Sequence, residues 1–155
     1  MKNAIGIEVE KAKQLSQGLN DLLANYQIFY QNLRGLHWNV KGKEFFELHL
    51  KFEELYNDAI LKVDEIAERI LTLGGTPLHT MTDYINNSEI KEINNVSDGP
   101  AGVQHVINNF SVLIGKERAL LSLSADADDE GTNSLMSDYI SQSEKLVWML
   151  TSYLG

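Results

Sequence analysis

The segment from Lys43 to Leu73 carries two stripes of residues at helical spacing, and it constrains the fold more than any other feature of the sequence. The segment ends at Gly74, with Pro77 just beyond, which is typical of a helix end. The first stripe is apolar throughout and comprises Phe45, Leu48, Phe52, Leu55, Ala59, Val63, Ile66, Ile70 and Leu73. The second stripe lies about 100° around the helix axis and comprises His49, Glu53, Tyr56, Ile60, Asp64, Ala67 and Leu71. A bundle core accounts for the first stripe, so the second stripe predicts another partner.

The residues before this segment predict a first long helix. Apolar residues of segment 15–36 alternate at spacings of three and four, as in a helix that faces a bundle core. Turn-forming residues at 39–42 predict that this helix ends near His37 or Trp38. Residues 1–14 are polar and weakly patterned, so we assign them to an N-terminal tail or a frayed helix start.

A long polar connection follows the second helix. Residues 76–99 contain one short helical candidate, around Thr82 to Ile85. A connection of this length is unusual inside a compact domain, but a four-helix bundle with a crossover requires one. Asp98 followed by Pro100 then predicts the start of a third helix.

The third helix is expected to end before segment 125–131, and Thr132 or Asn133 to open a fourth helix. No strand alternation and no repeat period appears in the sequence. We therefore predict an all-α four-helix bundle over residues 15–155, with a short helix in the crossover between the second and third helices.

Composition narrows the range of functions. A chain of 155 residues is expected to form one domain, and without cysteine it has neither disulfides nor thiolate metal sites. No stretch has the roughly 20 apolar residues of a membrane span, and the first residues do not form a signal peptide, so we expect a cytoplasmic protein. The net charge of -9 disfavours nucleic acid and anionic membranes. It suits a protein that attracts cations, or it provides ordinary solubility.

The spacing of five polar side chains suggests a metal site shared between two copies of the chain. His49 and Glu53 are four residues apart, as are Asp64 and Glu68, and residues at that spacing lie over one another on a helix. Glu53 and Asp64 are eleven residues apart, about 16 Å along the axis, which no single metal ion spans. Two antiparallel copies would bring the first pair of one onto the second pair of the other, with His37 joining His49. Imidazole and carboxylate ligands suit iron, zinc or manganese.

Each of these residues also has an ordinary structural interpretation. A single histidine on a helix is more often structural than a metal ligand, and acids four apart usually serve solubility. Glu53 has Lys51 and Asn57 as nearby alternatives for pairing, and Asp64 has Lys62. The metal hypothesis depends on the whole set lying on one stripe, because buried carboxylates need a partner.

The segment HWNVKGKEFFELHLKFEELYND, followed by VDEIAERI, closely resembles the signature of the Dps family of small ferritin-like proteins. LGGTPLHTMTDYI and the closing WMLTSYLG also fit that family, over about 130 residues in all. The resemblance implies a ferritin-like four-helix bundle that assembles into a hollow shell of twelve subunits. The shell is expected to oxidise Fe(II), preferentially with hydrogen peroxide, and to store ferric oxide. The resemblance also assigns the ferroxidase ligands to two subunits: His37, His49 and Glu53 from one, Asp64 and Glu68 from the other.

Glu53 and Trp38 belong to or adjoin this ligand set. Many family members carry aspartate where this sequence has Glu53, and the longer side chain could change the spacing of the metals or the affinity for them without removing a ligand. Trp38 matches the aromatic residue beside the family's site, which is thought to trap stray oxidising equivalents; a core aromatic is the alternative. Ferritins that build the site within one bundle use a Glu-x-x-His motif, which this sequence lacks.

The resemblance also bears on cation entry and on DNA. Family members line three-fold pores with acids from the turn before the last helix, here Asp126, Asp128, Asp129 and Glu130. Ser134 departs from the aspartate that relatives often carry there, and a solvated loop is the alternative. Relatives that bind DNA strongly tend to have a lysine-rich tail, whereas residues 1–24 carry three lysines against three acids.

We therefore expect weak or absent DNA binding. Two other functions remain as alternatives to the ferroxidase: a nucleoid-binding protein that shields DNA physically, and a structural or adhesive shell with a degenerate metal site.

Overall fold

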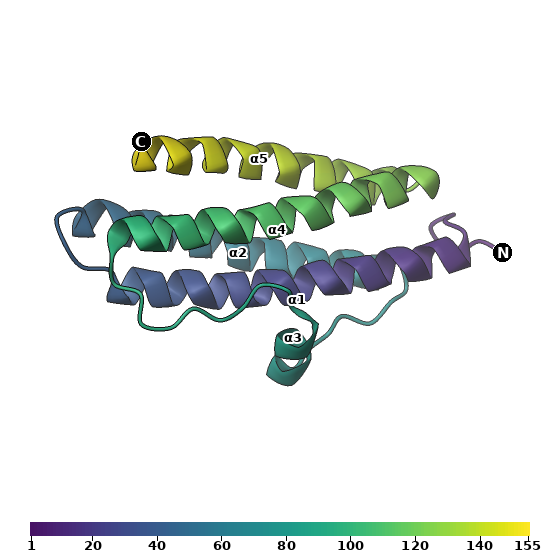
Figure 1. The fold of residues 1–155 in the computed structure, drawn as a ribbon. Coiled ribbons are helices and arrows are strands. Elements are labelled where there is room, and N and C mark those ends of the chain that lie inside the picture. The colour runs from purple at the N-terminus through teal and green to yellow at the C-terminus, as the bar shows by residue number, and fades with distance from the viewer.

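The computed structural model describes residues 1–155 and contains five helices and no strand. Four long helices form the bundle, and a short fifth lies in the connection between the second and third of them (Figure 1). In chain order the helices are α1 (Val9–Asn39), α2 (Phe45–Thr72), α3 (Met81–Asn87), α4 (Gly99–Asp126) and α5 (Glu130–Leu154). The predicted all-α bundle with a helix in its crossover is therefore confirmed.

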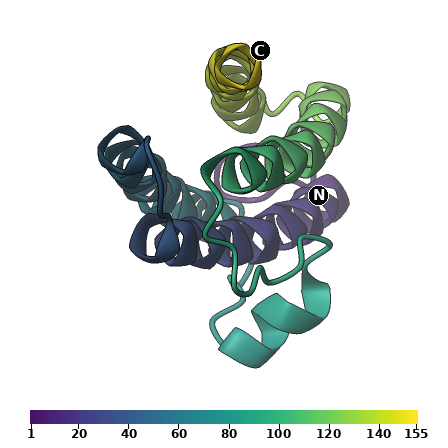
Figure 2. The ribbon, with the colours of Figure 1, turned by 60° about the vertical axis from the view of Figure 1, so that its left-hand side comes forward.

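Two helical hairpins make up the bundle. The α1 helix packs chiefly against α2, and α4 packs chiefly against α5. The long crossover returns the chain along α1, so that α4 starts at the same end of the bundle as α2, and α3 stands outside the four helices (Figure 2). No helix of the chain is long and apolar enough to span a membrane.

Local capping explains where the helices begin. Asp98 caps α4 as predicted, and its carboxylate accepts a hydrogen bond of 2.9 Å from the Ala101 amide. The α1 helix begins at Val9, before the apolar stripe that starts at Leu15, because Glu8 caps it. The α5 helix begins at Glu130, slightly earlier than the sequence indicated, because Asp129 is its N-cap.

The two stripes of α2 differ in burial, as expected. The first stripe is buried along its length except for Phe45, which is half-buried. On the second stripe, Ile60 and Leu71 remain 40% and 59% exposed, and Asp64 is also exposed. One chain therefore covers only one of the two faces of α2.

Two buried asparagines of α1 hold the crossover. The Asn25 side-chain oxygen accepts hydrogen bonds from the amides of Glu89 and Ile90, both at 3.0 Å, and from the Ser88 hydroxyl at 3.2 Å. Asn32 accepts from the Ile93 amide at 3.0 Å in the same manner. These side chains satisfy backbone groups that have no regular secondary structure of their own.

Replacing Asn25 with Ala is expected to loosen the crossover, since an unsatisfied buried amide costs about 1–3 kcal/mol. Hydrogen exchange of the Glu89 and Ile90 amides should accelerate, which peptide-resolved mass spectrometry measures. The matched control is Asn86→Ala, an exposed residue whose side chain makes no hydrogen bond. Unchanged exchange in Asn25→Ala would show that these bonds do not hold the segment.

Candidate metal centre

The turn between α1 and α2 brings His37 and His49 together. Their rings stack with centroids 3.8 Å apart and planes inclined by 11°. Gly42 adopts a φ of 114° in this turn, a conformation that side chains with a Cβ rarely adopt. The Lys41 amide also donates a 2.9 Å hydrogen bond to the Ser97 carbonyl, which ties the turn to the start of α4.

Each histidine is held by the other's backbone. The Nδ1 atom of His37 lies 2.6 Å from the carbonyl oxygen of His49, and Nδ1 of His49 lies 2.7 Å from the carbonyl oxygen of His37. A carbonyl oxygen only accepts hydrogen bonds, so both Nδ1 atoms carry the proton and donate. In the neutral rings, both Nε2 atoms then keep a free lone pair, as a metal-binding imidazole requires.

Glu53 lies one turn after His49 on the same face of α2. The Tyr56 hydroxyl donates a 3.3 Å hydrogen bond to Glu53 Oε1, and the Tyr56 ring meets His37 edge-on at 5.3 Å. Desolvation and the neighbouring Glu53 carboxylate raise the pKa of Tyr56, so its hydroxyl stays protonated and able to donate. Tyr56 was not identified from the sequence as a functional residue. Its position on the second stripe, three residues after Glu53, was the feature that could have indicated a contact with Glu53.

Arg34 and three aromatic rings flank this cluster. The Arg34 guanidinium lies 4.7 Å from the Trp38 ring centroid, 5.3 Å from that of Tyr56 and 5.6 Å from that of Tyr30. Trp38 is 57% exposed, so within one chain it is not a core aromatic. The Arg34 guanidinium therefore holds the exposed Trp38 indole next to the histidine pair.

Asp64 and Glu68 lie further along α2, and both are exposed. Their carboxylates form no ion pair within the chain, since Lys62 instead bonds Asp58 at 2.5 Å. Lys51, one of the two alternative partners of Glu53, is likewise engaged elsewhere, because it bonds Glu54 at 2.7 Å. No group of three or more His, Asp or Glu side chains in the chain is arranged to hold a metal ion.

The acidic turn divides into two kinds of residue. Asp129 is 2% exposed and bonds Arg69 at 2.7 Å, and it also accepts from the Thr132 amide at 3.0 Å. Asp126, Asp128 and Glu130 are exposed. Asp129 therefore orders the turn from within, while the other three acids face outward.

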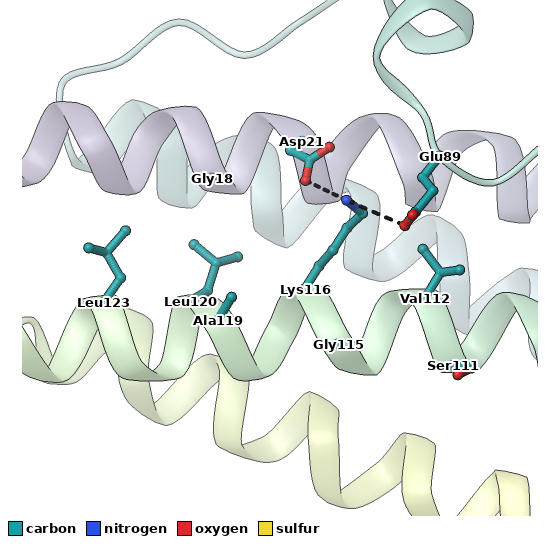
Figure 3. Close-up of a pocket in the computed structure, with 10 residues that line it drawn as sticks. All are labelled: Gly18, Asp21, Glu89, Ser111, Val112, Gly115, Lys116, Ala119, Leu120 and Leu123. Atoms are coloured by element: carbon teal, nitrogen blue, oxygen red, sulfur yellow. Dashed lines mark hydrogen bonds and ion pairs between the residues drawn. The ribbon is translucent and has the colours of Figure 1, made fainter.

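A cavity of about 530 Å³ lies elsewhere, between α1 and α4 (Figure 3). Lys116 crosses it and pairs with Asp21 at 2.8 Å and Glu89 at 3.8 Å. Because its lining has no histidine and its two carboxylates already share a lysine, it does not resemble a site for a transition metal.

The chain has the fold of the ferritin-like class: a four-helix bundle with a long crossover, and a helix face that bears histidines and acids. The family model of the ferritin-like domain matches residues 16–155. A DNA protection during starvation protein of Porphyromonas gingivalis is 40% identical over 148 residues, or 96% of this chain and 93% of that protein. The chain belongs to the Dps family.

Solved structures agree with this assignment. The crystal structure of a Dps protein from Vibrio cholerae O1 matches with a TM-score of 0.98 at 51% identity, covering 99% of this chain and 97% of the other. That protein is described as a member of a broad superfamily of ferritin-like diiron-carboxylate proteins. Dps from Staphylococcus aureus matches with a TM-score of 0.89 at 34% identity, covering 92% of this chain and 96% of the other.

If the histidine pair binds metal, His49→Ala should weaken Zn(II) binding by about tenfold or more, because it removes one imidazole and the ring that stacks on the other. Isothermal titration with Zn(II), which has no redox chemistry, measures this directly. His79→Ala is the matched control, since His79 is exposed and its ring bonds only the nearby Pro77 carbonyl. Equal affinity in the two variants would contradict the assignment.

Proposed function

We propose that the protein oxidises Fe(II) at a site shared between two copies of the chain and stores the ferric product within a shell. The observation that carries this proposal is the reciprocally bonded histidine pair, which leaves two Nε2 lone pairs free. Glu53 follows one turn after His49, on the less buried face of α2. In each site, His37, His49 and Glu53 come from one chain, and Asp64 and Glu68 come from the other.

Helix geometry supports an antiparallel pairing of two α2 helices. The two ligand groups are separated by about 16 Å along one helix, so a two-fold axis midway between them places the first group of one chain opposite the second group of the other. Ile60 and Leu71, exposed on the same face, then lose contact with water in the pairing. The axis generates two equivalent sites in each dimer.

The electron balance favours a site for paired irons. Reduction of one hydrogen peroxide takes two electrons and two protons and yields two waters, and each Fe(II) supplies one electron on becoming Fe(III). Two irons held together thus consume peroxide without releasing a hydroxyl radical. We propose peroxide as the preferred oxidant. Carboxylates favour Fe(III) as hard anionic ligands, and the imidazoles help to hold Fe(II). Zinc and manganese suit the same ligands and are expected to compete.

The outward-facing acids of the turn before α5 are proposed to attract iron into the shell. Asp126, Asp128 and Glu130 are exposed, and the chain carries a net charge of -9. We assign Asp129 a different task, because its ion pair with Arg69 joins the turn to α2.

DNA binding is proposed to be weak at physiological salt. Residues 1–8 fold back on themselves through a backbone bridge between Lys2 and Glu8, and Lys11 donates a hydrogen bond to the Asp126 carbonyl, so this segment is tied to the fold. Its three lysines are matched by three acids within residues 1–24, which leaves no net positive charge to neutralise phosphates. Compaction of DNA by stoichiometric protein in a gel shift at neutral pH would favour the alternative, a nucleoid-binding role.

The double variant His37→Ala/Asp64→Ala removes one ligand from each half of every site. Its initial rate of anaerobic Fe(II) oxidation by peroxide, followed by ferric absorbance, is expected to fall by at least about tenfold, the usual cost of a lost metal-ligand interaction. The wild-type protein with two Fe(II) per peroxide gives the reference rate. Equal rates would refute the ferroxidase proposal.

The shell proposal predicts an assembly of twelve 17.4 kDa chains, about 209 kDa, in light scattering. Ile60→Asp is expected to lower this mass and the rate of iron oxidation together, since it places a charge in the proposed interface. Ile85→Asp serves as the control, because Ile85 is 49% exposed and lies on α3, which packs against α1. A full-size assembly of Ile60→Asp with normal oxidation would contradict the shared site.

A further inference from the structure

A polar cluster lies inside the bundle, apart from the face that carries the proposed iron ligands. Lys62 of α2 is only 4% exposed, and Glu117 of α4 is fully buried. Tyr26 of α1 and Tyr139 of α5 are buried with them, so all four long helices contribute. None of these residues has a part in the proposed oxidation of iron.

The Lys62 ammonium is surrounded as a bound cation would be. Its Nζ lies 2.5 Å from Asp58 Oδ2 and 3.0 Å from the Gln142 side-chain oxygen. It also lies 5.1 Å from the centroid of the Tyr139 ring. A carboxylate, an amide oxygen and an aromatic face thus hold a positive charge at the border of the core.

The Glu117 carboxyl group has one oxygen that no other group of the chain contacts by a hydrogen bond. Its Oε1 is buried with no hydrogen-bond partner, and its Oε2 lies 3.5 Å from the Tyr26 hydroxyl. Burial raises the pKa of Glu117 to about 8, against the opposing effect of the Lys62 charge. A fully buried carboxyl with a free oxygen calls for a partner that the folded chain does not supply.

We propose that Lys62 occupies a latent metal site in the bundle core, and that its ammonium keeps divalent cations out of the bundle. Ferritin-like bundles build metal sites in their cores from carboxylates on facing helices. Here the core offers Asp58 and Glu117 carboxylates and the Gln142 amide oxygen, a ligand set for a hard divalent cation such as Mn(II). The chain has no ready-made cluster of three such ligands, and a third acid, Glu65, accepts a hydrogen bond of 3.1 Å from the Tyr139 hydroxyl.

A route to the latent site is present. A cavity of about 400 Å³ between α2 and α5 is bordered by Asp58 and Gln142, the two residues that hold the ammonium. We expect that shortening Lys62 opens a path from this cavity toward Glu117. By filling that space, Lys62 leaves the face between subunits as the place where metal binds, and this consequence rests on the proposed function.

The test counts Mn(II) bound per chain in the assembled protein, by equilibrium dialysis and electron paramagnetic resonance. Lys62→Ala is expected to bind one ion per chain more than wild type, and Lys62→Arg, which keeps the cation, no more than wild type. Lys62→Ala/Glu117→Gln should lose the additional ion, since it removes one carboxylate ligand. An unchanged count in Lys62→Ala, or an additional ion that persists in the double variant, would overturn the proposal.

Lys62→Gln guards against a variant that fails to fold, because it removes the charge and keeps most of the side chain. Mn(II) is expected to raise its thermal midpoint more than that of Lys62→Arg. Equal shifts in the two variants would overturn the proposal. Failure of the wild-type protein to oxidise Fe(II) would refute the proposed function instead. The latent site would still be tested by the difference in bound Mn(II) between Lys62→Ala and wild type.

Discussion

The uncovered second face of α2 is the constraint on which the account depends. The first face is buried within the chain, while the second combines exposed apolar side chains with the carboxylates of Glu53, Asp64 and Glu68. An apolar face is stabilised by another surface, but carboxylates resist burial unless a cation neutralises them. A second copy of the helix together with metal ions meets both needs. Assembly and iron chemistry are therefore proposed to share the same residues.

The histidine pair shows how the backbone prepares this face. The turn between α1 and α2 sets two carbonyl oxygens against two ring nitrogens, so the tautomer of His37 and of His49 is fixed before any metal arrives. Tyr56 restrains Glu53 by a hydrogen bond, and Arg34 packs against the Tyr56 ring. Because side chains held in place lose less freedom on binding, such an arrangement favours metal affinity.

The sequence predicted the features that depend on local periodicity and capping. The helices, the crossover helix and the Asp98 cap all follow from spacing and residue type, and they are confirmed. The family resemblance was also correct. The assignment of the five ligands remains a prediction, because one chain cannot bring the two halves of such a site together.

What the sequence did not reveal depends on contacts between distant residues. The reciprocal histidine bonds require the exact path of a turn, and the Arg69–Asp129 pair joins residues sixty positions apart. Lys62 was considered as a partner for Asp64, but residues two apart on a helix do not face each other, and it bonds Asp58 one turn earlier. Its burial in the core depends on how α5 packs, which spacing along α2 does not describe.

The most direct test of the shared site is complementation between inactive chains. His37→Ala and Asp64→Ala chains, unfolded and refolded together in equal amounts, form mixed dimers in which one of the two sites has every ligand intact. Random pairing makes half of the dimers mixed, so the mixture should regain about a quarter of the wild-type rate of Fe(II) oxidation. A site contained within one chain would regain nothing, and a mixture no more active than either variant alone would contradict the account.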